Sequence, residues 1–232
     1  MRKFPVVIAA GLALATATAG AQVGYPPASS PFLDVEQRHA VTGFFGYFSA
    51  KRDPAAVAPK GGPMGGLQYE WRASGPLHLG MSFMTVASER TTLDPSKPIA
   101  ERVVGTEKQP LFAADGFLAV SLTGERSWHH LMPVVGAGLG LITDTKNADV
   151  GGFRFGTRFA FPWSVGVRWI PGGGSLQLRA DVKDWMYTIK YPQAYYTSST
   201  SGEAAIVPTN VPASRWTNNF AMTVGGSYTF QR

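Results

Sequence analysis

The sequence predicts an all-β chain that folds as an eight-stranded, antiparallel, up-and-down transmembrane β-barrel. Three observations lead to this prediction. Large apolar residues alternate with polar or small ones in segments of about ten residues, long and short connections follow one another in turn, and aromatic residues gather at the strand ends. The predicted barrel occupies residues 41–232, after a signal peptide at residues 1–21 and a periplasmic leader at residues 22–40.

The clearest alternation lies between Phe159 and Val182. Every second residue from Phe159 to Trp169 is large and apolar, and the residues between them are small or polar. After a short Pro-Gly-Gly-Gly-Ser stretch the same alternation resumes from Leu176 to Val182, which predicts a hairpin. Because the bulky face carries aromatic residues and each strand is about ten residues long, we expect this face to contact lipid.

The first residues are typical of a secretory signal peptide. Arg2 and Lys3 form a basic start, residues 4–15 are apolar, and Ala19-Gly20-Ala21 is a small-residue cleavage site. The chain has no cysteine, which excludes a disulfide framework. We expect export to the outer membrane of a Gram-negative-type bacterium. Without Arg2 and Lys3 the mature chain has 19 basic and 15 acidic residues, and this net charge of +4 is too mild and too scattered to predict binding to nucleic acid.

The leader and the first strand are the least regular parts of the pattern. The leader is expected to be unpaired, with one or two helical turns at residues 32–38, because Ser30 and Pro31 suit a helix start. The first strand, at residues 41–49, carries aromatic residues on both faces, so its register stays open. Its glycines are expected to allow a close approach of neighbouring backbones.

The remaining strands follow in order. Those at residues 65–73, 77–83, 114–123 and 131–141 each place large apolar residues on one face, and the last strand, at residues 219–230, does the same. With the hairpin described above, the count is eight. The long connections are residues 51–64, 88–110, 143–157 and 188–215, as expected for extracellular loops opposite short periplasmic turns. Ten strands remain an alternative if residues 203–211 form a hairpin arm, although Pro208 and Pro212 argue against it.

Aromatic residues mark two girdles. The periplasmic girdle is expected to contain Trp71, Trp128, Trp169, Tyr228 and Phe230, and the outer girdle Trp185, Tyr187 and Trp216. The seventh strand changes phase near Lys183-Asp184. We therefore predict a β-bulge there, which would turn Trp185 and Tyr187 outward.

The signal peptide, the alternating strands and the terminal Ser227-Tyr228-Thr229-Phe230 resemble the small outer-membrane barrels of the OmpA, OmpX and OmpW type, over residues 41–230. In that family the closing strand is read by the barrel assembly machinery. The resemblance therefore implies an assembly signal at Tyr228 and Phe230. The departure from the family pattern is that Gln231 and Arg232 follow the closing aromatic residue.

The predicted inner face carries both acidic and basic side chains. Eight strands enclose a space that side chains can fill, so we expect these groups to pair rather than line a pore. A narrow polar conduit is the alternative, since basic residues outnumber acidic ones. The predicted polar network of the lumen consists of Glu70, Arg72, Asp115, Arg158, Arg168, Arg179, Asp181 and Lys183, with His78 on the same face.

No catalytic, cofactor or metal site is predicted. Lipid A deacylases with the same barrel use a histidine and a serine close together on a late, lipid-facing strand, whereas His78 and Ser82 lie on an early strand and are expected to point inward. His129 and His130 are adjacent, and adjacent residues of a strand point to opposite faces. The alternating glycines at residues 136–140 precede no helix, so they do not form a dinucleotide-binding loop.

The long loops are the remaining candidates for function. Tyr191, Tyr195 and Tyr196, followed by residues 197–202, have the composition of a recognition surface. The basic residues expected at the outer rim, where lipopolysaccharide phosphates lie, are Lys146, Arg154, Lys190 and Arg215.

We therefore expect a structural or surface-interaction role rather than catalysis. The expected partners are outer-membrane lipids including lipopolysaccharide, the barrel assembly machinery and an extracellular ligand at the loops, with no cofactor. The alternatives are a small-solute channel of the OmpW kind and, less expected, a lipid A-modifying enzyme.

Overall fold

The computed structural model describes residues 30–173, 175–198 and 202–231. The predicted signal peptide at residues 1–21 lies outside the described residues. The chain divides into two compact units, Met1–Phe32 and Leu33–Arg232, and the barrel belongs to the second. No helix among the described residues is long and apolar enough to cross a membrane.

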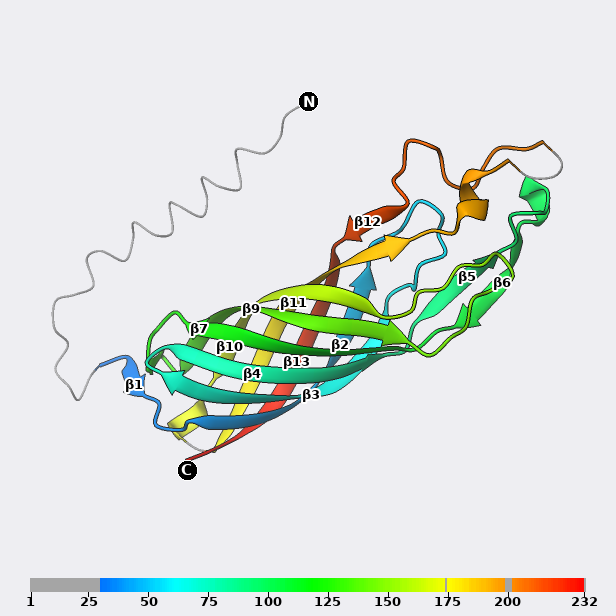
Figure 1. Cartoon of the computed structure of the whole chain (residues 1–232). Helices are drawn as coiled ribbons and strands as arrows, with labels where there is room; N and C mark the ends of the chain where they lie inside the picture. Colours follow the sequence, from blue (N-terminus) through cyan, green and yellow to red (C-terminus); the bar gives the residue numbers. More distant parts are fainter. Residues whose placement is uncertain (1–29, 174, 199–201, 232) are drawn as a thin grey trace. The chain divides into compact units, whose positions relative to one another are not determined.

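Eight strands close into one antiparallel barrel, as predicted (Figure 1). Each barrel strand pairs with the next one along the chain, and the last pairs with the first over twelve residues, from Phe230 opposite His39 to Asn219 opposite Ala50. The barrel strands are β2 (His39–Ala50), β3 (Gly62–Ser74), β4 (Leu77–Val86), β7 (Leu111–Ser121), β9 (Leu131–Asp144), β10 (Arg158–Trp169), β11 (Leu176–Lys190) and β13 (Asn219–Phe230). Within residues 202–211 there is no strand, so the ten-strand alternative is wrong.

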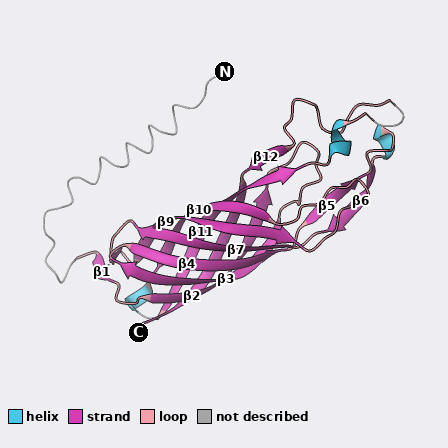
Figure 2. Cartoon of the chain, viewed as in Figure 1, coloured by secondary structure: helices cyan, strands magenta, loops and turns pink. Residues whose placement is uncertain are grey.

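Shorter elements complete the described chain, and strands dominate it (Figure 2). The additional strands are β1 (Phe32–Asp34), β5 (Glu89–Leu93), β6 (Val103–Lys108), β8 (Arg126–Trp128) and β12 (Ser214–Thr217). The 3-10 turns are η2 (Ile99–Glu101), η3 (Pro171–Gly173) and η4 (Gln193–Tyr196).

The connections are sorted by length between the two ends of the barrel. The lower end carries the short connections β3–β4, β7–β9 and β10–β11, together with the end of β13 (Figure 1). The upper end carries four long connections, at residues 51–61, 87–110, 145–157 and 191–218, which we call the cap. The cap includes the β5–β6 hairpin and β12, which pairs with the upper end of β11.

The outward face of the barrel is apolar along its length. Leu67, Met81, Leu139, Val165 and Met222, from five different strands, are all at least half exposed. Their neighbours in sequence point inward, so the alternation predicted for the hairpin of β10 and β11 and for the strands before it is confirmed. A soluble protein would bury these side chains, because each exposed apolar surface costs free energy in water.

The first strand has aromatic residues on both sides. Phe45 and Tyr47 are exposed on the outward face, whereas Phe48 is completely buried and Phe44 packs beside it inside the barrel. The two faces can both be apolar because the upper part of the interior is itself apolar. The presence of aromatic residues on both faces of β2 explains why its register could not be predicted from the sequence.

The leader is not the helical segment that the sequence predicted. Residues 32–34 form β1, a short strand that pairs with β8, and the hydroxyl of Ser30 accepts a hydrogen bond from Phe32 N at 3.2 Å instead of capping a helix. The free backbone edge of β8 explains the difference, because an extended segment can satisfy it and a helix cannot.

The predicted β-bulge at Lys183-Asp184 is also absent from the described strands. β11 keeps a single register against β10 and β13, so Trp185 and Tyr187 stay on the inner face, where they are 0% and 1% exposed. Asp184 does face outward but is covered there. Its carboxylate accepts hydrogen bonds from Trp163 Nε1 at 3.2 Å, Asn218 Nδ2 at 2.6 Å and Asn219 N at 2.8 Å. These donors replace water, so no bulge is needed.

Candidate functional site: the barrel interior and the cap

The barrel interior has two layers of different polarity. The layer nearer the lower end holds charged and polar side chains and is called the polar tier. The layer nearer the upper end holds large apolar side chains and is called the apolar tier. The polar tier contains Thr42, Gln68, Glu70, His78, Ser82, Asp115, Arg168, Arg179, Asp181, Lys183 and Ser227.

Glu70 lies at the centre of the polar tier. Its Oε2 is 2.7 Å from Arg168 Nη2 and 2.8 Å from Arg179 Nη1, and all three side chains are almost completely buried. Arg179 also pairs with Asp181, two residues along the same strand. The carboxylate of Glu70 therefore ties β3 to β10 and β11 across the interior. A buried carboxylate with two guanidinium partners is the arrangement that makes buried charge tolerable.

A second cluster lies higher in the same tier. Lys183 Nζ is 3.0 Å from both carboxylate oxygens of Asp115 and 3.2 Å from Ser82 Oγ, which in turn donates to Asp115. The ammonium group also faces the rings of Phe117 and Trp185, at 5.4 and 5.0 Å from their centroids. Lys183 thus joins the polar tier to the apolar tier through its cation–π contact with Trp185.

The cavity beside this cluster holds about 30 Å³, room for one or two water molecules but not for a substrate. Ser82 and Lys183 resemble a nucleophile and its base in composition only. Lys183 Nζ is paired with Asp115 and donates to Ser82 Oγ, which is the opposite direction from the one in which a base would accept the serine proton.

The predicted network residues do not all meet. Three acidic residues of the set, Glu70, Asp115 and Asp181, share the polar tier with Arg168, Arg179 and Lys183, so acidic and basic residues of the set are equal in number there.

Two further arginines of the predicted set lie elsewhere. Arg72 reaches the lower mouth, where it donates to the carbonyl oxygens of Val35 and Glu36 in the leader. Arg158 lies near the cap, with its Nη2 3.2 Å from Arg154 O and its guanidinium 5.9 Å from the centre of the Phe155 ring.

The leader crosses the lower mouth of the barrel. Val35 packs against the apolar cluster of Phe117, Ala119, Met132, Val134 and Ile170, and its N–H donates to Glu125 O at 3.0 Å. Asp34 pairs with Arg126 at 2.8 Å. Only a cavity of about 20 Å³ remains between the leader and the Glu70 cluster. The sequence carried no signal for this contact, because the leader has no alternation of its own.

The apolar tier is continuous with the core of the cap. Trp185, Tyr187 and Phe48 from the barrel pack in one buried cluster with Phe153 and Phe155 from the connection between β9 and β10. Phe155 meets Tyr187 edge-on, with 5.6 Å between ring centroids. The prediction of a polar lumen therefore holds only for the lower layer. The alternation of residues is the same in the lower and upper parts of a strand, so the sequence pattern did not show where the polar interior ends.

Arg90 is the main polar anchor inside the cap. Its Nη1 lies 2.9 Å from Asp149 Oδ2 and its Nη2 lies 3.4 Å from Glu107 Oε2. Lys146 donates to the other oxygen of Glu107 at 2.8 Å, and this hydrogen bond lowers the pKa of Glu107 from its ordinary range. The β5–β6 hairpin is thereby fixed to the connection between β9 and β10.

The predicted tyrosine recognition surface is wrong for two of its three residues. Tyr195 is fully buried and Tyr191 is 7% exposed, so both belong to the core of the cap. Tyr191 Oη donates to Asp53 Oδ2 at 3.1 Å, and burial raises the pKa of Tyr191. Part of the remaining stretch, residues 199–201, lies outside the described residues. Tyr191 and Tyr195 therefore belong to packed structure rather than to an exposed recognition surface.

The histidines do not form a metal site. His39 Nδ1 is 2.8 Å from Tyr69 Oη, and His130 Nδ1 is 3.0 Å from Ile170 O. His78 is buried beside the Glu70 cluster, and His129 occupies a turn with φ of 47°. No group of three or more potential metal-binding side chains occurs among the described residues.

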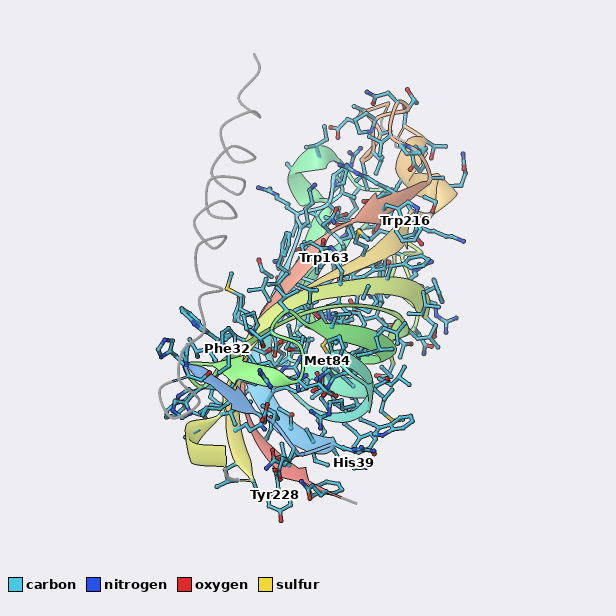
Figure 3. The ribbon with its side chains drawn as sticks, turned by 90° about the vertical axis from the view of Figure 1, so that its left-hand side faces the viewer. Phe32, His39, Met84, Trp163, Trp216 and Tyr228 are labelled. Atoms are coloured by element: carbon cyan, nitrogen blue, oxygen red, sulfur yellow. The ribbon has the colours of Figure 1, made fainter. Side chains whose placement is uncertain are left out.

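The aromatic residues at the lower rim are placed as predicted. Trp71, Trp128, Trp169 and Tyr228 are exposed, and Tyr228 and His39 lie at one end of the barrel while Trp216 lies toward the other (Figure 3). At the chain end, Phe230 stacks on Tyr228 and on His39, with 6.2 and 5.2 Å between ring centroids. Trp216 is the only predicted member of the upper girdle that faces outward among the described residues.

The fold has counterparts among solved structures. The chain is similar to Neisserial surface protein A, with a TM-score of 0.51 and 11% identity, over 83% of this chain and 97% of that one. It is also similar to the N-terminal β-barrel domain of Pseudomonas aeruginosa OprF, with a TM-score of 0.44 and 11% identity, over 84% of this chain and 98% of that domain. For Ail, the attachment invasion locus protein of Yersinia pestis, the TM-score is 0.42 at 11% identity, over 84% and 100% of the two chains. No protein-family model and no curated protein matches the chain in sequence.

Proposed function

We propose that this protein is an outer-membrane β-barrel whose lumen is closed and whose cap presents a rigid surface at the cell exterior. The observation that carries the proposal is the reversal of polarity, with an apolar outward face around a charged lower interior. Such a wall is stable in a bilayer, where all backbone groups pair between strands and no edge is left open. In this placement the cap is extracellular and the short turns are periplasmic.

The sealed interior supports a structural or surface-interaction role over a channel. The leader covers the lower mouth, the Glu70 cluster fills the lower layer, and buried aromatic residues fill the upper layer. Charged solutes would have to displace Trp185 and Phe155 from a dry core. The OmpW-like channel is therefore the weaker candidate, and a flat current trace in planar bilayers is the expected result.

The chemistry of the interior gives no support to a lipid-modifying enzyme. Ser82 and His78 both point into the barrel, out of reach of an acyl chain outside it, and Lys183 is held by Asp115. We expect lipid A from cells with and without the protein to have the same mass spectrum. A mass change of an acyl group in the expressing cells would contradict this expectation.

The stack of the exposed Tyr228 on the partly buried Phe230 supports the proposed assembly signal. Both residues lie on the last strand, where the assembly machinery would meet an extended chain before closure. Gln231 continues past the stack and its side-chain amide donates to Glu36 Oε2 at 3.2 Å, so Gln231 contacts the leader. We expect Phe230→Ala to reduce the amount of protein in the outer membrane more than Phe220→Ala, which removes an exposed aromatic residue elsewhere on β13.

Cell fractionation followed by electrophoresis with and without boiling tests the proposal as a whole. Recovery in the outer membrane with a heat-dependent change in mobility is the expected result. Protease added to whole cells should reach the cap but not the short turns. Recovery as a soluble periplasmic protein, with no change on heating, would overturn the membrane placement.

A further inference from the structure

Three basic side chains converge at the upper rim, where β2 ends and β12 begins to pair with β11. Lys51, Arg52 and Arg215 are all exposed and line one small pocket, which holds about 10 Å³ and also contacts Tyr191 and Thr217. Two elements far apart in sequence bring them together. Lys51 is fixed at its backbone, where its N–H donates to Asn219 Oδ1 at 3.1 Å, and Arg215 is held on β12 opposite Ile189.

The positive charge of this pocket is not neutralised by the protein. Asp53 is the only acidic residue that lines it, and its carboxylate already accepts hydrogen bonds from Val57 N, Ala58 N and Tyr191 Oη. None of the three basic side chains forms an ion pair with any described residue. The pocket therefore has an excess of positive charge, which attracts an anion.

Two basic residues in the interior of the cap are ion-paired instead. Arg90 is buried between Asp149 and Glu107, and Lys146 is paired with Glu107. Lys146 was one of the four residues predicted to meet phosphate, and this pairing removes it from that set. Arg90 and Lys146 are therefore ion-paired, whereas Lys51, Arg52 and Arg215 lie close together without an ion pair to any described residue.

The pocket lies at the upper edge of the outward apolar face. Trp216 follows Arg215 directly, is 56% exposed, and its ring lies 5.6 Å from that of Phe161. Tyr47, four residues before Lys51, is also exposed on the outward face. Aromatic residues of this kind mark the boundary between hydrocarbon and headgroups, which is the level of lipid phosphates.

We propose that Lys51, Arg52 and Arg215 bind a phosphate monoester group. Such a group carries a charge of about −1.5 to −2 at neutral pH and has three acceptor oxygens, which matches several converging cationic donors. The source is either the headgroup of a membrane lipid or a soluble phosphate compound. The assignment of the phosphate to a lipid headgroup rests on the proposed membrane placement. The attraction between the positive charge of the pocket and a phosphate does not depend on that placement.

The experiment compares the triple variant Lys51→Ser/Arg52→Ser/Arg215→Ser with the control Lys60→Ser/Lys97→Ser/Lys108→Ser. Both remove three exposed positive charges from the upper end, but the control residues lie away from the pocket. Binding is measured by calorimetry in two arms at constant ionic strength. One arm uses inorganic phosphate with protein in a zwitterionic detergent, and the other uses nanodiscs of phosphatidylcholine with or without phosphatidic acid.

We expect the triple variant to lose at least about tenfold in affinity and the control to stay within about twofold, because each lost charge-assisted hydrogen bond is worth a measurable fraction of binding. Binding in both arms supports a general phosphate site, binding only to phosphatidic acid supports a lipid ligand, and binding only to inorganic phosphate supports a soluble one. No binding in either arm, or equal binding by the triple variant, overturns the proposal.

Folding is checked by the heat-dependent mobility of each variant. If the triple variant does not fold, the single changes Lys51→Ser and Arg215→Ser replace it, with an expected loss of about threefold each, and Arg215→Lys should restore most of the binding because it keeps the charge. The detergent arm does not depend on where the protein resides in the cell. Failure of the phosphate site and failure of the membrane placement are therefore distinguishable.

Discussion

Arg90 Nη1 lies 2.9 Å from Asp149 Oδ2, and the two side chains are only 1% and 3% exposed. This ion pair joins the β5–β6 hairpin to the connection between β9 and β10, two parts of the cap that lie 59 residues apart in sequence. Its burial means that neither charge can be left alone without cost.

Asp149→Ala should loosen the contact between the β5–β6 hairpin and the connection between β9 and β10. Removing one partner of a buried pair costs up to about 3–5 kcal/mol, and in this variant Arg90 keeps only its longer contact, 3.4 Å to Glu107 Oε2. We expect rapid proteolytic cleavage within residues 87–110, with the heat-dependent mobility of the barrel retained. Glu89→Ala is the control, since Glu89 is exposed and its side chain has no ion pair among the described residues. Equal protease resistance in both variants would contradict the assigned role of Arg90.

Gly46→Ala should impair barrel assembly, whereas Gly43→Ala on the same strand should not. A Cβ at Gly46 would lie 1.9 Å from Met222 O and 2.8 Å from Thr223 Cα, so the backbone of β13 would have to move. At Gly43 the nearest atom is Leu67 Cδ2 at 3.9 Å. Overpacking of this kind costs about 1–3 kcal/mol. The measurement is the urea midpoint of the folded band on electrophoresis, and similar midpoints for the two variants would be the adverse result.

Trp163→Phe should destabilise the upper end of β10 and β11. The change replaces the indole with a smaller phenyl ring and removes the Nε1–H that donates to Asp184 Oδ2 at 3.2 Å, so an outward-facing carboxylate loses a donor. The expected cost is about 1–3 kcal/mol. Trp169→Phe is the matched control, because Trp169 faces outward at the lower end of the same strand and makes no hydrogen bond from its side chain among the described residues. The free energy of unfolding in lipid vesicles should fall only for Trp163→Phe.

Acid should loosen the cap through Glu107. The hydrogen bond from Lys146 lowers the pKa of Glu107 below its ordinary value of 4.5, so its contribution to stability is present above that pH and is lost as the pH falls through the lowered pKa. Hydrogen exchange in β6 should therefore accelerate below about pH 4.5. Lys146→Met should move this transition to higher pH, whereas Lys108→Met should not. An exchange rate that is independent of pH, after correction for intrinsic exchange, would rule out this coupling.

The sequence was sufficient to predict the barrel because each strand alternates sharply. Phe159 to Trp169 and Leu176 to Val182 have the orientation that their spacing predicts, and the lengths of the connections identify the two ends. These features are local, and each repeats along the chain. The assignment of each strand pair is therefore supported by the same pattern in the neighbouring pair.

The interior was harder to predict because its polarity changes with height. Alternation predicts that Trp185 shares a face with Lys183, but a bulge was predicted at Lys183-Asp184 because Asp184 would otherwise face lipid, and the bulge would turn Trp185 outward. The structure instead places Trp185 over the ammonium group of Lys183, beneath a cap that excludes water. Only the three-dimensional packing of Phe153, Phe155 and Tyr195 against the strands shows that this part of the interior is apolar.

The sequence predicted that Glu70, Arg168 and Arg179 belong to a network of paired charges, but it did not predict which residues pair with each other. The sequence placed all three on the inner face, but partners come from strands that meet only when the barrel closes. Arg72 and Arg158 were assigned to the same network and lie at its two ends, because inward direction alone does not give depth along the barrel.

The packed cap limits how the exposed part of the protein can diverge or be redesigned. Changes at Phe153, Phe155 or Tyr195 alter a shared core, so antigenic drift and epitope grafting at these positions would disturb the barrel strands beneath them. The tip of the β5–β6 hairpin is different, because residues 96–100 are all exposed. A foreign peptide displayed on this scaffold therefore belongs between Ser96 and Ala100, where an inserted segment leaves the shared core of Phe153, Phe155 and Tyr195 unchanged.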